Sequence, residues 1–521
     1  MATKAGTQAL QHGGNAFDAA AATTLALGVV EPGSSGIGGG GFFLLYIAKE
    51  NRYTMIDARE TSPKLAGHGE VYQTQSSING AQSAGVPGLL AGVDHLISKY
   101  GRISREISSS PAIQLASHGF PVSAHLQTMI NWRKDVFNDA AQGIFLQDGE
   151  VPNKQSLLRQ SALADTLTRF AKRGADDFYH GETAGRLVAD MKRDGGLIRA
   201  DDLANYKVIE REPVQFDYRD THFVSASLPS SGGITMAETL GILQDDDLAA
   251  LSDADRAHLL IEAMKRAYKD RNQHLGDKDF VRIPNLLDPT RLKVLRDSID
   301  MNKATSSSDL ADFIEPMGNS VDTTHFSIID DEGNMVSATL SINYGMGSGY
   351  VSPSTGILLN DEMDDFATRP GKPNAYGLVQ GKANAIAPNK RMLSSMSPTF
   401  VIDKKRTFIV GTPGGSRIIS MVLLASTGFI KDASKPEQWV NAPRFHHQFL
   451  PDVVQYEAGA FSPELILELQ HRGHQLKQIR NYGNMQAILW NRENDSLTGI
   501  SDQRGEGESA QYSLPQNKLS D

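Results

Sequence analysis

The chain has 521 residues, a formal net charge of −10 and no cysteine. A chain of this length can bury a large core, either as one composite body or as two to four domains. Its acidic balance, without a long run of Lys and Arg, argues against nucleic acid or an anionic membrane as a partner and favours small molecules or peptides. The lack of cysteine excludes disulfides, thiolate catalysis and cysteine-ligated metals.

The beginning of the sequence carries no evident targeting segment. Residues 1–6 lack the apolar core of a signal peptide, and the most apolar stretch, residues 19–30, is too short to span a bilayer. This pattern favours a cytoplasmic protein but leaves the localisation open.

The first part of the chain is expected to combine helices with a few strands. Residues 7–30 predict two helices separated by Gly13-Gly14-Asn15, and strands are predicted at 42–46 and 53–56. Amphipathic periodicity then predicts a mostly helical outer layer over residues 85–300, with the clearest helical segments at 111–116, 161–172 and 256–269.

A glycine cluster follows the first helices. Gly36, Gly38 and Gly41 match the spacing Gly-x-Gly-x-x-Gly, but a dinucleotide site needs a strand before this motif and a helix after it. Here the order is reversed, so we expect these glycines to allow close backbone packing. Two later segments, 229–233 and 270–277, are also assigned packing roles, since nothing in them demands chemistry.

Residues 322–343 predict a β-hairpin around the turn signal Asp331-Glu332-Gly333. In its second strand apolar and polar residues alternate, so one face carries hydroxyl groups and an amide. If residues 331–333 form the loop, Thr323 lies opposite Ser341. A solvated sheet face rich in Ser and Thr is the alternative explanation. The polar positions of the second strand are Ser337, Thr339, Ser341 and Asn343.

The residues before the hairpin, 301–322, are polar and rich in serine, which is typical of a long exposed loop. Such a loop can bring the carbonyl group of Asp322 within reach of the Thr323 hydroxyl. Attack through an ester would then cut the bond between Asp322 and Thr323. The α-amine of the new N-terminus, with an unperturbed pKa of about 8, can act as the base for the hydroxyl of the same residue.

Several motifs, in this order along the chain, resemble one family. They are Asp-Thr-Thr-His-Phe-Ser at 322–327 followed by Asp-Xaa-Xaa-Gly-Asn, Gly-Ile-Leu-Leu-Asn-Asp-Glu-Met-Asp-Asp-Phe at 356–366 and Leu-Ser-Ser-Met-Ser-Pro-Thr at 393–399. Together they closely resemble the γ-glutamyltranspeptidases, N-terminal nucleophile hydrolases that cut themselves before such a threonine. The resemblance runs from near residue 5 to the C-terminus.

The resemblance implies an α+β fold, a four-layer αββα sandwich built as one composite body. Two autocleaved fragments, residues 1–322 and 323–521, would remain associated as a heterodimer. Family members need no metal and no cofactor. They are commonly exported and usually have an extra segment before the residues that match the beginning of this chain.

The resemblance also implies the site. Thr323 would be the nucleophile, Ser341 would orient its hydroxyl, and Gly414 and Gly415 would form the oxyanion hole. Arg59, Ser394 and Ser395 would bind the α-carboxylate of the substrate, for which the planar fork of an arginine is suited. Asn343, Glu362 and Asp365 would accept hydrogen bonds from its ammonium group.

Some of these residues have simpler explanations when they are considered alone. Arg59 beside Glu60 would ordinarily be a surface ion pair, and the acids at 362–365 would be a solvated loop. Many bacterial family members carry Gln at the position of Glu362 and Thr at the position of Ser341, and both changes preserve hydrogen bonding.

Two further motifs occur after the hairpin. The Pro- and Gly-rich segment 369–377 resembles a lid that covers the pocket in some family members, with Tyr376 at its tip, although an exposed tyrosine on a loop can also be without a role. His446 and His447 are adjacent and are expected to point apart, so we interpret them as structural and not as metal ligands.

The function expected from the resemblance is acyl transfer. Thr323 would attack the γ-amide of glutathione or a related γ-glutamyl compound, and water or the amine of an amino acid or peptide would take the glutamyl group. A cephalosporin or glutaryl acylase on the same fold is the nearest alternative. An uncleaved, non-catalytic binding protein is the alternative from another class.

Overall fold

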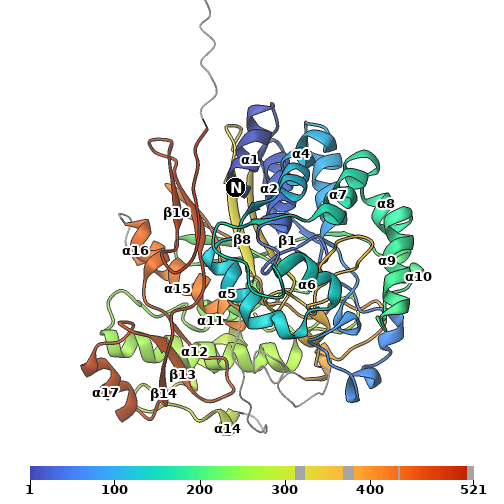
Figure 1. Cartoon of the computed structure of the whole chain (residues 1–521). Coiled ribbons are helices and arrows are strands. Elements are labelled where there is room, and N and C mark those ends of the chain that lie inside the picture. Colours follow the sequence, from blue (N-terminus) through green and yellow to red (C-terminus); the bar gives the residue numbers. More distant parts are fainter. Residues whose placement is uncertain (311–322, 368–380, 432–434, 513–521) are drawn as a thin grey trace, which may run out of the picture.

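The computed structural model describes residues 1–310, 323–367, 381–431 and 435–512. Two antiparallel sheets lie face to face, with β11 packed against β8 and β9. Helices cover the outer face of each sheet, so the layers run helix, sheet, sheet, helix (Figure 1). This is the α+β four-layer sandwich that the sequence analysis expected.

Each sheet combines strands from both sides of residue 323. The first sheet has the order β5 (Ile209–Arg211), β2 (Arg52–Asp57), β1 (Gly40–Ile47), β9 (Met335–Ser341), β8 (Thr324–Ile329). The second has the order β16 (Ser496–Ser501), β15 (Gln486–Asn491), β11 (Arg406–Gly411), β10 (Thr399–Ile402), β7 (Thr221–Ser225), β6 (Val214–Tyr218). All neighbouring strands in both sheets are antiparallel.

The helices fall into two outer layers and a set of peripheral elements. In the layer over the first sheet, α2 (Ala16–Val30) contacts β8 and β9. Three helices pack on α2, namely α1 (Ala2–Gln11), α3 (Leu89–His95) and α4 (Arg105–His118), and α7 (Ser161–Arg173) packs on α4. In the layer over the second sheet, α11 (Gly232–Ile242) contacts β6 and β7, α15 (Ile418–Lys431) contacts β11, and α12 (Asp253–His274) packs on α11. The predicted helices at 7–30, 111–116, 161–172 and 256–269 are therefore confirmed.

The remaining elements are short and peripheral. The helices are α5 (Ala124–Arg133), α6 (Asp139–Phe145), α8 (Ala175–Tyr179), α9 (Glu182–Arg193), α10 (Ala200–Asn205), α13 (Pro289–Asp297), α14 (Ser307–Leu310), α16 (Pro436–Asn441) and α17 (Pro463–His471). The strands are β3 (Phe120–Pro121), β4 (Leu157–Leu158), β12 (Phe445–His446), β13 (Val454–Glu457) and β14 (Leu476–Ile479). Across the described ranges, every helix is too short or too polar to traverse a bilayer.

Strand β1 shows why its sequence is apolar at almost every position. Phe43 and Leu45 point into the core under the helices of the first layer, and Phe42 and Leu44 point into the core that includes the second sheet. Successive side chains of a strand face opposite sides, so a strand covered on both faces needs apolar residues at both.

The glycine cluster before β1 has the packing role expected of it. A Cβ atom added to Gly41 would lie 2.5 Å from the carbonyl oxygen of Thr339 on the neighbouring strand. Helix α2 precedes the cluster and β1 follows it, which is the reverse of the order in a dinucleotide site. Only glycine permits the two backbones to approach this closely.

The predicted hairpin register is confirmed. Thr324 pairs with Leu340 and His325 with Thr339, and continuing this register places Thr323 opposite Ser341. The polar face is buried and not solvated, because it packs on the second sheet. Ser337, for example, donates to the carbonyl oxygen of Val410 at 3.3 Å. The alternative of a solvated sheet face is therefore wrong.

The segment expected to be an exposed loop before the hairpin is described only as far as residue 310. Residues 301–306 are irregular and mostly exposed or half-buried, but 307–310 form the helical turn α14, with Ser307 buried. Asp322 lies outside the described residues, so its place at the proposed cleavage site stays a prediction.

A buried charged cluster on α12 holds this segment in place. Glu262 contacts Lys265 at 3.1 Å and Arg266 at 2.6 Å, and it accepts the backbone N–H of Thr305 at 3.2 Å. Burial alone would raise the pKa of Glu262, but the two cations lower it from 4.5 to about 2. The backbone N–H of Ser307 donates to Asp452 at 2.7 Å, which ties the same segment to the C-terminal part of the chain.

Glu262→Gln should lower the free energy of unfolding at neutral pH by on the order of 3 kcal/mol, because it leaves the buried Arg266 without its carboxylate and leaves Lys265 only Asp452, at 3.4 Å. A carboxyl group with a depressed pKa stabilises the fold above pH 4.5 and loses that contribution as the pH falls toward about 2. Urea unfolding followed at several pH values measures the difference between the two proteins, which should shrink over this interval.

Glu182→Gln, at an exposed pair with Arg186, is the control and should change stability by less than about 1 kcal/mol. A constant difference between pH 7 and pH 2 would contradict the assignment.

Candidate active site

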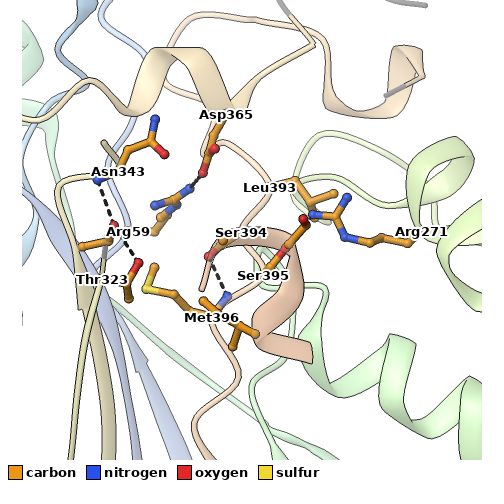
Figure 2. Close-up of a pocket in the computed structure, with 13 residues that line it drawn as sticks. Arg59, Arg271, Thr323, Asn343, Asp365, Leu393, Ser394, Ser395 and Met396 are labelled. Atoms are coloured by element: carbon orange, nitrogen blue, oxygen red, sulfur yellow. Dashed lines mark hydrogen bonds and ion pairs between the residues drawn. The ribbon is translucent and has the colours of Figure 1, made fainter. Parts of the chain in front are cut away.

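A small cavity opens where the first residues of β8 meet the loops that follow β2, β9 and β11. Figure 2 shows its walls, which carry mainly polar and charged side chains. The lining residues are Arg59, Arg271, Thr323, Ser341, Asn343, Asp365, Leu393, Ser394, Ser395, Met396, Gly415, Ser416 and Ile418. They come from at least five separate parts of the sequence, and the two-sheet packing brings them together.

Thr323 lies at the start of the hairpin with its hydroxyl directed toward Ser341. The two hydroxyl oxygens are 3.4 Å apart, and the backbone N–H of Asn343 donates to Ser341 Oγ at 2.8 Å (Figure 2). Asn343 ends the strand in a left-handed conformation with φ of 72°, which asparagine tolerates better than most residues. Its side-chain amide donates to the carbonyl oxygen of Asp361 at 3.1 Å. The Ser341 hydroxyl is thus held where it can orient the Thr323 hydroxyl.

Arg59 is 1% exposed and lies among carboxylates on the same wall. Its guanidinium contacts Glu362 at 2.6 Å and Glu60 at 3.6 Å, and it also pairs with Asp365. Burial raises the pKa of Glu362 well above its usual range, while Arg59 opposes that shift. Burial also raises the pKa of Glu60 to about 8. The arginine and the acids that the sequence analysis assigned to opposite ends of a substrate therefore also bind one another.

The hydroxyl oxygens of the adjacent Ser394 and Ser395 each accept a hydrogen bond from another part of the protein. Ser394 Oγ accepts the backbone N–H of Met396 at 3.1 Å, and Ser395 Oγ accepts a guanidinium N–H of Arg271 at 2.8 Å. A hydroxyl has one proton to donate in addition to its acceptor sites. Because both serine oxygens already accept a hydrogen bond from the protein, both can turn their protons toward an anion in the cavity.

The glycine pair after β11 forms a tight turn at the edge of the cavity. Gly414 has φ of 153° and Gly415 has φ of 55°, and both values lie in the range that side chains disfavour. A Cβ atom at Gly414 would lie 2.1 Å from Met421 Cε. Gly415 lines the cavity and begins the short helical turn that leads into α15. Backbone N–H groups at such a turn are suited to an oxyanion.

The structure brings together most of the residues that the sequence analysis selected. Glu362 is held against the cavity residue Arg59, and Gly414 adjoins the lining residue Gly415. Tyr376 lies outside the described residues, so its lid role stays a prediction. The predicted residues that line the cavity directly are Arg59, Thr323, Ser341, Asn343, Asp365, Ser394, Ser395 and Gly415.

Sequence reasoning missed Arg271. It was assigned to packing together with the rest of 270–277, yet its guanidinium reaches the cavity wall (Figure 2). Helical periodicity identified its helix but gave no indication that this buried position faces a site. The apolar lining residues Leu393, Met396 and Ile418 were also not selected.

Three buried histidines have partners other than Thr323. His325 is two residues from Thr323, but its ring nitrogens contact Thr339 at 2.9 Å and Ser327 at 3.2 Å. Burial lowers the pKa of His325 to about 3, so it is neutral at ordinary pH. His446 contacts Ser420 and Gln448, and His447 contacts Asp452 and the backbone of Phe449. Within the described ranges, no three acidic or histidine side chains are grouped to hold a metal ion.

Comparisons with known proteins place the chain in a family. The gamma-glutamyltranspeptidase family model matches residues 2–512. A protein of Pseudomonas sp. strain A14 named glutathione hydrolase proenzyme is 42% identical, with 94% of this chain and 87% of that protein covered. A protein of the same name from Escherichia coli K12 is 40% identical, with 96% and 89% covered.

Two solved structures are similar as well. A cephalosporin acylase from Bacillus halodurans has a TM-score of 0.87 and 26% identity, with 99% of this chain and 94% of that chain covered. A Helicobacter pylori gamma-glutamyltranspeptidase has a TM-score of 0.57 and 35% identity, with 59% and 91% covered. The fold, the cavity and these similarities lead to one conclusion: the chain belongs to the gamma-glutamyltranspeptidase family.

Proposed function

We propose that the chain is an autoprocessing γ-glutamyltransferase that cleaves the γ-glutamyl amide bond of glutathione and related compounds. It passes the glutamyl group to water or to the amine of an amino acid or peptide. The observation that carries this proposal is the Thr323 hydroxyl in one cavity with an arginine, acidic groups and two serine hydroxyls. The names of the relatives, glutathione hydrolase proenzyme, support both the substrate and the processing.

Autoprocessing would begin at Thr323. Its hydroxyl oxygen attacks the carbonyl carbon of Asp322, the bond between that carbon and the Thr323 nitrogen breaks, and the hydroxyl proton ends on the released amine. Water then hydrolyses the ester, which returns the hydroxyl of Thr323 and leaves a carboxylate on the first fragment. Ser341, 3.4 Å from Thr323, is placed to orient the hydroxyl in both steps.

Turnover would reuse the same hydroxyl. The free α-amine of Thr323 takes the proton as Oγ1 attacks the γ-carbonyl carbon, and the backbone N–H groups at Gly414 and Gly415 stabilise the oxyanion. The amine leaving group departs with a proton, and a glutamyl ester of Thr323 remains. Water or an acceptor amine attacks this ester and releases the glutamyl group. No cofactor enters any step.

The substrate would be held at both charged ends of its glutamyl group. The α-carboxylate lies toward Ser394, Ser395 and Arg59, and the ammonium lies toward Asn343, Glu362 and Asp365. Arg59 pairs with both Glu362 and Asp365. The carboxylate and the ammonium of the substrate would therefore each meet a protein charge that its neighbour already balances in part. This arrangement suits a zwitterion better than an ion of one sign.

The heterodimer is part of the same proposal, with fragments 1–322 and 323–521. Strand β1 of the first fragment pairs with β9 of the second, and β7 of the first pairs with β10 of the second. Both central sheets would therefore hold the fragments together after the chain is cut. Breaking them apart would expose two large apolar cores.

Two alternatives stay open to experiment. The similarity to a cephalosporin acylase favours the first, an amidase for glutaryl groups, which lack the ammonium. Such a substrate would bring no cation to the three acids around Arg59, which a single guanidinium balances only in part, at a cost of about 1–3 kcal/mol. The names of the relatives, glutathione hydrolase proenzyme, disfavour the second alternative, an uncleaved binding protein, which predicts a single intact polypeptide.

Thr323→Ala should abolish both processing and activity, because it removes the attacking oxygen. Thr323→Ser keeps a hydroxyl and should still be cut, and it serves as the matched control. Denaturing gels and N-terminal sequencing of the smaller fragment measure processing, and release of p-nitroaniline from γ-glutamyl-p-nitroanilide measures activity. Cleavage or turnover by Thr323→Ala would remove Thr323 from its proposed role.

Asp365→Asn should weaken γ-glutamyl substrates selectively. The amide can still accept a hydrogen bond from Arg59 but carries no charge for the ammonium, so kcat/KM should fall about 10- to 100-fold. Glutaryl-p-nitroanilide, which differs only in lacking the ammonium, should lose much less. Equal losses on the two substrates would show that Asp365 does not bind the amine.

The two fragments should remain together after cleavage. Size-exclusion chromatography under native conditions should give one peak, and denaturing gels of that peak should give two bands in equal amounts. The reason is that each central sheet contains strands of both fragments. Separation of the fragments without denaturant would contradict the heterodimer.

A further inference from the structure

Arg271 is a buried cation with neutral partners. It lies on α12, is 1% exposed and reaches the wall of the cavity (Figure 2). Its guanidinium donates to Ser231 Oγ at 2.9 Å, to Asn272 Oδ1 at 2.9 Å and to Ser395 Oγ at 2.8 Å. Each acceptor is an uncharged side-chain oxygen.

Among the described residues, the two other arginines that are only 1% exposed have carboxylate partners. Arg59 pairs with Glu362 and Asp365, and Arg266, five residues before Arg271 on the same helix, pairs with Glu262 at 2.6 Å. In the part of the chain that the structure describes, no carboxylate oxygen lies within 4.0 Å of the guanidinium nitrogens of Arg271. Burying a cation without a carboxylate in contact is costly, and this cost lowers the pKa of Arg271, while Tyr268 and the more distant Asp365 oppose the shift.

These hydrogen bonds alone do not explain why a positively charged residue is buried at position 271. A neutral donor such as glutamine could satisfy serine hydroxyls without placing a cation in the interior. A full positive charge at a cavity wall becomes favourable when the cavity receives an anion. The serine that Arg271 contacts is one of the pair whose protons can turn toward such an anion.

We propose that Arg271 is a positioning residue for the α-carboxylate of the substrate and acts through Ser395. Its N–H occupies an acceptor site of Ser395 Oγ, which directs the serine proton into the cavity. Its charge adds to that of Arg59, and Figure 2 shows the two guanidinium groups on opposite sides of the serine pair. This inference rests on the proposed function, because it assigns a role within the same substrate site.

The glutamyl group has two charged ends, and the role proposed for Arg271 concerns only one of them. Arg271 should matter for the carboxylate and not for the ammonium. Two p-nitroanilides separate these ends: γ-glutamyl-p-nitroanilide carries both charges, and 4-aminobutyryl-p-nitroanilide keeps the amine and lacks the carboxylate. The ratio of kcat/KM for the two substrates then reports carboxylate recognition alone.

The test compares Arg271→Gln and Arg271→Lys with the wild-type protein. Arg271→Gln should reduce the ratio about 10- to 100-fold, mainly through a higher KM for the γ-glutamyl substrate. Arg271→Lys keeps the charge without the planar fork and should give an intermediate ratio. If Arg271→Gln does not fold, the ratio for Arg271→Lys decides, and an unchanged ratio there overturns the inference.

Arg266→Gln is the matched control, because it removes a buried, ion-paired arginine from the same helix. It should lower the melting temperature without changing the ratio. Two results would show that Arg271 has only a structural role. One is that Arg271→Gln lowers kcat/KM equally for both substrates. The other is that Arg266→Gln changes the ratio as much as Arg271→Gln does.

A double-mutant cycle tests the route through Ser395. If Arg271 acts mainly through this hydroxyl, Arg271→Gln should cost clearly less in a Ser395→Ala background than in the wild-type protein, and its charge should account for the smaller loss that remains. Fully additive effects would overturn the coupling. A wild-type protein that is processed but hydrolyses neither p-nitroanilide would instead refute the proposed function, and this inference with it.

Discussion

The antiparallel pairing of β8 with β9 is the constraint on which the site depends. It places Thr323 opposite Ser341 and turns the polar residues of β9 toward the second sheet. Buried hydroxyls need hydrogen-bond partners. Ser337 finds them on the second sheet, at Val410 and Thr399, and Thr339 contacts His325 on the neighbouring strand β8. A slip of one residue would place these groups against the apolar core under α2 and leave them unmatched. The register of one hairpin therefore fixes both the place of Thr323 and the packing of the two sheets.

Charge is distributed unevenly around the cavity that this packing creates. On one side Arg59 is surrounded by carboxylates, and burial keeps the pKa of Glu60 and Glu362 raised. On the other side, the described residues that Arg271 contacts through hydrogen bonds offer neutral oxygens. The serine pair lies between the two arginines (Figure 2). An acidic region beside a cationic one is the complement of a zwitterion, such as the glutamyl group of the proposed substrate.

Local sequence patterns were sufficient to predict the features that depend on residues close together in the chain. Alternation and turn chemistry gave the hairpin register, and helical periodicity gave α4, α7 and α12. The resemblance to a family supplied the layers and most cavity residues. The pairing of Arg59 with Asp365 and the exposure of Arg271 to the cavity could not be predicted, because these contacts join residues far apart in the chain. Burial of the polar face was left open for the same reason, since alternation identifies a face but not what covers it.

The central claim is that Thr323 carries the glutamyl group during turnover. The most direct measurement is mass spectrometry of the protein after rapid acid quenching in the presence of a γ-glutamyl substrate, followed by digestion and peptide mapping. The account predicts that the mass of one glutamyl group is added to the peptide that begins with Thr323. An adduct on any other residue, or turnover with no covalent intermediate on this peptide, would contradict it.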